Sequence, residues 1–325
     1  MLKPGRLLTA MVTPFDSEGH LDVLKAGELA RHLLSVGSDG LVVCGTTGES
    51  PTLGHDEKIQ MFKAVIAAVG GAHVVAGTGS NDTRATIALS EEAEELGAGA
   101  LLAIAPYYNK PDQEGLFQHF KAVATHTHLP VILYNHPPRT GVSISAQTLS
   151  RLIECCPNIV GIKDSSGSLD VCSEFRSVIK PGFLLYSGND SLTLPIMAIG
   201  GHGAISVASH VAGPELKEMI NLAAENRFDR ARELHFKLWD LMNALFSTPS
   251  PAPIKAALLH HGWKTGSVRL PLVDMPPVPR AKLVEILERT LGTPQQRAQE
   301  DIGRRTIVEE SPPADLEARP RPAEV

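Results

Sequence analysis

The chain has 325 residues, of which 43% are hydrophobic and 20% charged, a composition typical of a folded globular protein. Its 30 Lys and Arg are outnumbered by 36 Asp and Glu, and the absence of a long basic block argues against nucleic acid as a partner. No run reaches the roughly 18 apolar residues of a membrane span, and the first residues lack the pattern of a signal peptide. We therefore expect a cytoplasmic protein with one large domain.

Eight short apolar runs recur along the chain at intervals of roughly 20 to 35 residues, the spacing of a βα repeat. They start at Leu7, Asp39, His73, Gly99, Pro130, Asn158, Phe183 and Gly203. Because the runs lack polar alternation, both faces of each strand should be buried. An open doubly wound sheet is the alternative, but it favours a GxGxxG turn after the first strand, where this chain has TPFDSEG. The pattern predicts an α/β protein with a (β/α)8 TIM barrel over residues 1–225.

After Val207 the sequence continues in stretches rich in helix formers, which predict a C-terminal helical extension over residues 226–292. From residue 293 the chain is rich in Gln, Glu, Arg and Pro with almost no large apolar residue, and we predict a disordered tail over 293–325. The four cysteines show neither a CxxC pair nor a zinc-type spacing with His. They are Cys44, Cys155, Cys156 and Cys172, and we predict reduced, buried thiols, with no metal and no cofactor.

The active site of such a barrel lies at the C-terminal ends of its strands. Lys163 follows the apolar run IVGI, where burial would favour a neutral amine able to attack a ketone and form an imine. The alternative is a solvated lysine paired with Asp164. Tyr134 ends the preceding strand, so its phenol would lie beside the imine and relay protons, unless it is only a packed tyrosine.

Two further strand ends offer groups for carboxylates. The turn Gly45-Thr46-Thr47-Gly48 presents two hydroxyls and consecutive backbone N–H groups, although a capping turn would look the same. Arg139, in the stiff segment PPRTG, could hold a second carboxylate by a bidentate contact, or could be a surface arginine.

Together these segments resemble the dihydrodipicolinate synthase / N-acetylneuraminate lyase superfamily from Leu7 to about Gly292. The motifs, in the family's order, are TAMVTPF, GTTGESPTL, AGTGSNDT, APYYNKPDQEGL, YNHPPRTG, GIKDSSG, SGND and GGHGAISV. The resemblance implies that Lys163 forms the imine with pyruvate. It also implies a proton relay of Tyr134, Thr46 and Tyr108, in which a neighbouring subunit supplies Tyr108 and Tyr107 packs at the same interface.

The resemblance further implies where the substrates bind. The Thr46 and Thr47 amides would take the pyruvate carboxylate, while Gly188 and the Ile205 carbonyl would line the keto-acid site. Arg139 in YNxPxRTG favours L-aspartate-4-semialdehyde as the second substrate, giving 4-hydroxy-tetrahydrodipicolinate for diaminopimelate and lysine biosynthesis. The expected assembly is a homotetramer, a dimer of dimers.

Alternative functions remain open on the same scaffold. GIKDSSG also occurs in aldolase relatives, so the chain could be a pyruvate-forming aldolase of 2-keto-3-deoxy sugar acids or 4-hydroxy-2-oxoglutarate that uses the same lysine. A barrel that only binds a ligand is a second alternative.

The resemblance also bears on inhibition by lysine. Ser50, His55, Asn81 and Tyr107 match the groups that bind lysine in inhibited members, but Lys58 and Ala85 replace a histidine and a glutamate. Because these changes add a positive charge and remove a carboxylate, we expect weak or absent inhibition by lysine.

Overall fold

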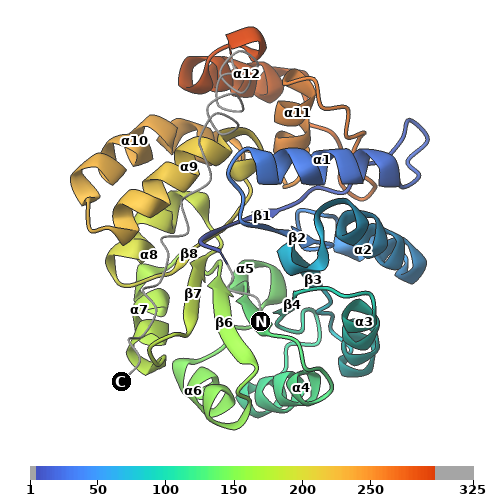
Figure 1. Ribbon diagram of the computed structural model, residues 1–325, viewed down its shortest axis with the longest axis vertical. Coiled ribbons are helices and arrows are strands. Elements are labelled where there is room, and N and C mark those ends of the chain that lie inside the picture. The colour runs from blue at the N-terminus through green and yellow to red at the C-terminus, as the bar shows by residue number, and fades with distance from the viewer. Residues whose placement is uncertain (1–4, 297–325) are drawn as a thin grey trace, which may run out of the picture.

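The computed structural model describes residues 5–296 and closes eight parallel strands into a barrel, shown end-on in Figure 1. The strands are β1 (Leu7–Ala10), β2 (Gly40–Val43), β3 (Val74–Gly77), β4 (Ala100–Ile104), β5 (Val131–Asn135), β6 (Ile159–Asp164), β7 (Leu184–Ser187) and β8 (Gly203–Ser206). Each predicted apolar run contains one strand, and β8 pairs with β1 to close the sheet. The predicted TIM barrel is therefore confirmed, and an open doubly wound sheet is excluded.

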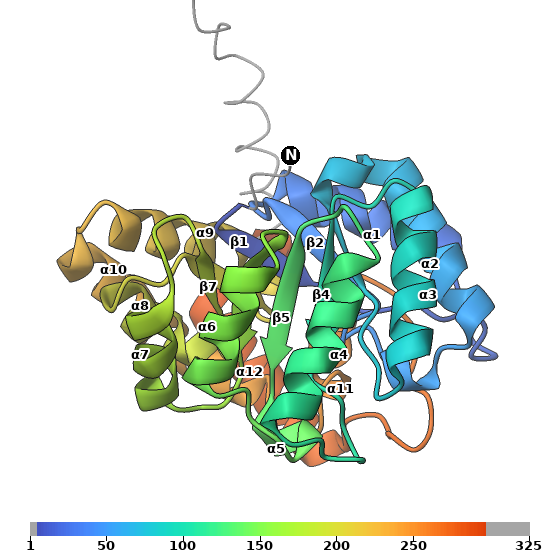
Figure 2. The same cartoon turned by 90° about the horizontal axis from the view of Figure 1, so that it is seen from below.

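Helices follow the strands and surround the barrel (Figure 1). They are α1 (Val23–Ser35), α2 (His55–Val69), α3 (Thr83–Glu95), α4 (Gln113–Thr125), α6 (Ala146–Cys155), α7 (Leu169–Val178), α8 (Thr193–Ala198) and α9 (Ser209–Ala224). A short helix, α5 (Pro137–Thr140), follows β5. Several helices start where an Asp or Ser side chain accepts a backbone N–H, as Asp22 does from Lys25. Figure 2 shows β5 running towards α5, which marks the end of the barrel where its strands finish.

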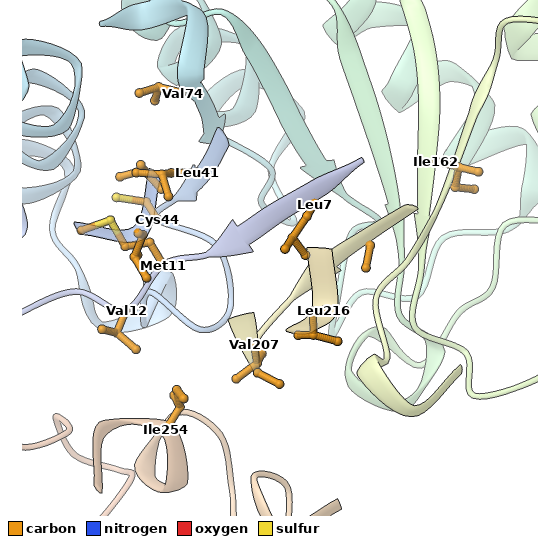
Figure 3. Close-up of a cluster of buried hydrophobic side chains, with 14 of the residues drawn as sticks. Leu7, Met11, Val12, Leu41, Cys44, Val74, Ile162, Val207, Leu216 and Ile254 are labelled. Carbon is orange, nitrogen blue, oxygen red and sulfur yellow. The ribbon is translucent and has the colours of Figure 1, made fainter. Parts of the chain in front are cut away.

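Buried side chains form two layers. An inner cluster fills the barrel and includes Leu8, Ile132, Tyr134 and Ile205. A larger outer cluster packs between strands and helices. Successive side chains of a strand point to opposite faces, so each strand supplies both layers. Figure 3 shows part of the outer layer, where Ile254 of the C-terminal helices points towards Val12 and Val207.

The C-terminal extension consists of α10 (Phe228–Ala244), α11 (Ala252–His260) and α12 (Pro277–Leu291). The helical pattern that the sequence continues after Val207 is broken at Asn226, whose φ of 61° ends α9 and lets α10 turn away. The boundary between residues 225 and 226 remains a prediction. The predicted tail lies, from residue 297 on, outside the described residues.

One sequence expectation needs correction. Cys44, Cys156 and Cys172 are buried free thiols, but Cys155 is exposed. It is the last residue of the amphipathic helix α6, where the chain turns back towards β6 and the preceding side chain is also at the surface. Among the helices of residues 5–296, none is long and apolar enough to cross a membrane.

Candidate active site

Lys163 is buried at the C-terminal end of β6, only 5% exposed. Its register partners on either side are Tyr134 in β5 and Tyr186 in β7, both of which belong to the inner cluster. Lys163 therefore points into the barrel, and its Nζ lies 4.2 Å from the centre of the Tyr134 ring. The contact between lysine and tyrosine that the two strand ends predict is present.

Asp164, the next residue, points the other way. Its Oδ1 accepts a hydrogen bond from Asn135 Nδ2 at 2.8 Å, and its Oδ2 accepts one from Ser166 Oγ at 2.6 Å. Cys172 Sγ lies 3.4 Å from the same Oδ2. Asp164 is thus occupied on the outer side of β6, and a solvated pair with Lys163 is not what the structure contains.

A cavity of about 220 Å³ opens at this end of the barrel. Thr46, Tyr107, Tyr134 and Arg139 line it, together with Cys44, Gly45, Ser50, Pro51, Gly77, Gly79, Leu102, Ile104 and Thr140. Thr46, Tyr134 and Arg139, which the sequence predicts to act on the substrates, therefore share one cavity although they come from three separate segments. Arg139 is placed there by α5, whose cap Gly141 adopts a positive φ of 74° that glycine tolerates.

Gly188 lies directly against the lysine. A Cβ at Gly188 would come within 2.8 Å of Lys163 Cε and 2.0 Å of Ser165 Oγ, so no larger residue fits without displacement. Ile205 is fully buried in the inner cluster with Tyr134. Thr47 is also buried but does not line the cavity.

Tyr108 is not brought into the cavity of its own chain. It follows β4 in a left-handed conformation, with φ of 72°, and its side chain is 89% exposed. Tyr107 lines the cavity of its own chain. Its packing at a subunit interface, which the resemblance implies, stays a prediction.

Sequence reasoning missed His136, which caps α5 between Tyr134 and Arg139. Its ring centre lies 5.5 Å from that of Tyr134. Burial, together with the charges of Arg139 and Lys163, lowers the pKa of His136 to about 4, so the ring is neutral near pH 7. Its position in the sequence between Tyr134 and Arg139 could have indicated that it lies near the site.

A closed barrel with a buried lysine, a tyrosine, a threonine and an arginine at its mouth has the architecture of the class I barrel lyases. The chain belongs to the dihydrodipicolinate synthetase family, whose model matches residues 3–290. Similar curated proteins include the 4-hydroxy-tetrahydrodipicolinate synthase of Desulforudis audaxviator, 50% identical over 87% of this chain and 96% of that protein. The synthase of Heliobacterium modesticaldum is 53% identical over 83% of this chain and 90% of its own length.

A solved structure supports the same assignment. The dihydrodipicolinate synthase of Cyanidioschyzon merolae, crystallised with lysine bound, superposes with a TM-score of 0.87. The two chains are 42% identical, and the match covers 89% of this chain and 99% of that one. The family predicted from the motifs is confirmed.

Proposed function

We propose that the protein is a lyase that condenses pyruvate with L-aspartate-4-semialdehyde to 4-hydroxy-tetrahydrodipicolinate. The observation that carries the proposal is Lys163, buried inside the barrel beside Tyr134 and next to a cavity that Arg139 lines. The synthase name of relatives about 50% identical over most of their length supports this choice of substrates.

In the proposed reaction Lys163 Nζ attacks the keto carbon of pyruvate, and the keto oxygen leaves as water when the imine forms. Loss of a proton from the methyl carbon gives an enamine, which attacks the aldehyde carbon of the second substrate. The amino group of that substrate then attacks the imine carbon, closes the ring and releases Lys163. Tyr134, Thr46 and Tyr108 would carry the protons of these steps.

The binding roles follow from placement. Thr46 and Thr47 would hold the pyruvate carboxylate through their backbone N–H groups at the end of β2. Gly188 leaves room beside the lysine, and the Ile205 carbonyl would face the keto acid. Arg139, on a separate element, would pair with the carboxylate of the semialdehyde.

We infer that the working unit is at least a dimer, because Tyr108 is exposed and lies outside its own chain's cavity. A partner subunit would bring this hydroxyl to the relay. The homotetramer, a dimer of dimers, stays a prediction from the family resemblance. The cytoplasmic location remains a prediction from the sequence.

The test is to treat the protein with pyruvate and borohydride, which reduces the imine to a stable adduct, and to map that adduct by peptide mass spectrometry. A turnover assay with aspartate semialdehyde follows on the same preparation. We expect an adduct on Lys163, and turnover. Lys163→Met should abolish both, whereas Lys217→Met, on the outer helix α9, should abolish neither. An adduct without turnover would instead favour the aldolase alternative, and no adduct would refute the imine mechanism.

A further inference from the structure

The loop after β2, which carries Thr46 and Thr47, has a backbone that its own sequence does not favour. Cys44 at its start and Glu49 near its end both have a φ of 57°, in the left-handed region that residues with a Cβ rarely occupy. Such a conformation persists only where surrounding structure holds it in place. The groups that hold this loop therefore bear on the geometry of the two threonines.

The side chain of Glu49 is held by two residues of the C-terminal extension. Its carboxylate is 1% exposed, and Oε1 lies 2.8 Å from Nζ of Lys255, which is itself 3% exposed. Its Oε2 accepts a hydrogen bond of 2.8 Å from the backbone N–H of Arg269. Lys255 also donates to the carbonyl of Ser267 at 2.9 Å. Burial lowers the pKa of Lys255 and the adjacent Glu49 opposes that shift, as expected when each charge compensates the other.

Arg269 ties down the residues that follow the loop. Its guanidinium makes a bidentate contact with Glu57 at 2.6 and 2.8 Å, and donates to the carbonyl of Thr52 at 2.9 Å. The two cations also lie close to the ring of Phe15, with Lys255 Nζ 4.3 Å and Arg269 Cζ 4.2 Å from its centre. We call the contacts of Lys255 and Arg269 with Glu49, Glu57 and Phe15 the clamp. The clamp connects the loop after β1, the loop after β2 and the C-terminal extension.

The clamp acts at the end of the barrel where the strands finish. Lys255 lies in α11, and Arg269 in the segment between α11 and α12. Figure 2 shows α11 and α12 on the side towards which β5 points. A contact that only stabilised the fold could lie at either end of the barrel. The ion pair of Lys217 with Asp39 is an example at the opposite end, because Asp39 lies just before β2 begins.

We propose that Lys255 and Arg269 are positioning residues, which act through Glu49 to hold the Thr46–Thr47 loop in the conformation that binds the pyruvate carboxylate. The C-terminal extension is then part of the pyruvate site without touching pyruvate. This inference rests on the proposed function of the two threonines.

The experiment compares Glu49→Gln, Lys255→Met and the double variant, in the full-length protein. The pyruvate concentration that half-saturates borohydride trapping of Lys163 is measured, with KM for each substrate. We expect a rise of roughly tenfold or more in half-saturation and in KM for pyruvate, the effect of misplacing a hydrogen bond to a carboxylate. KM for the semialdehyde should stay within twofold, because Arg139 lies on a different element. A general loosening of the fold would raise both KM values.

Lys217→Met is the matched control, since it also removes the lysine of an ion pair between distant segments, but at the other end of the barrel. It should leave pyruvate saturation unchanged. Where a single variant does not fold, the double variant, which leaves neither charge unpaired, provides the test. Folded variants with wild-type pyruvate saturation would overturn the inference, as would equal rises in both KM values. Failure of the wild-type protein to trap pyruvate would instead overturn the proposed function, so the two failures are distinguishable.

Discussion

Arg139 lines the cavity from α5, whereas Lys163 lies in β6 beside the cavity residue Tyr134, so the contributions of Arg139 and Lys163 should be separable by substitution. We predict that Arg139→Ala raises KM for aspartate semialdehyde roughly ten- to hundredfold, because a charge-assisted contact to a carboxylate is lost. Borohydride trapping of Lys163 by pyruvate should not change. Steady-state kinetics with each substrate varied in turn provide the measurement, with the surface variant Arg227→Ala as control. Unchanged kinetics with the semialdehyde would contradict the role given to Arg139.

His210 is a second residue whose role can be tested, through its protonation state. Its two hydrogen-bond partners require a neutral ring. Nδ1 lies 2.8 Å from the carbonyl of Val207 and so donates, while Nε2 accepts the backbone N–H of Val12 at 3.1 Å. Burial lowers the pKa of His210 to about 4. Between about pH 6.5 and pH 4 the unfolded chain therefore binds a proton that the folded protein resists, and stability is lost as pH falls.

For His210 alone this loss amounts to on the order of 2 kcal/mol by pH 5. We predict that His210→Gln, which can keep both hydrogen bonds without titrating, loses less stability than the wild type between pH 7 and pH 5. Urea unfolding at the two pH values measures the difference. His20→Gln, at an exposed site, should follow the wild type. If His210→Gln shows the full wild-type loss, protonation of His210 is not its cause.

At the scale of elements, α11 joins the extension to the barrel and has most of its residues buried. Ile254 is fully buried and points towards Val12 and Val207 at the strand ends (Figure 3), whereas Leu259 on the same helix is 44% exposed. We predict that Ile254→Ala lowers the free energy of unfolding by about 3 kcal/mol, and Leu259→Ala by less than about 1 kcal/mol. Chemical denaturation of the two variants is the measurement. Equal losses would show that α11 does not pack as described.

The eight strands could be predicted because each is a short apolar run bounded by polar or glycine residues, and Lys163 and Tyr134 because they end neighbouring runs. The break between α9 and α10 could not, since Asn226 lies within a stretch of good helix formers and stops the helix only through its left-handed backbone. The clamp on Glu49 was equally hidden. Its partner Arg269 lies 220 positions away in the sequence, and local patterns carry no signal for a contact of that kind.

At the scale of the whole molecule, the proposal that a partner subunit supplies the exposed Tyr108 can be tested by mixing two variants. If each site takes Lys163 from one subunit and Tyr108 from its partner, Lys163→Met and Tyr108→Phe should each be inactive or nearly so alone. In a mixed dimer, however, one of the two sites receives an intact lysine from the Tyr108→Phe subunit and an intact tyrosine from the Lys163→Met subunit.

Equal mixing with free subunit exchange makes half of the dimers mixed, each with one intact site of two, so activity should recover to roughly a quarter of the wild-type value. The two variants are dissociated together in mild denaturant, reassembled and assayed, beside each variant treated alone. If Tyr108 served its own chain, every subunit in the mixture would lack either the lysine or the tyrosine. Activity would then stay at the mean of the two variants, and the shared site would be refuted.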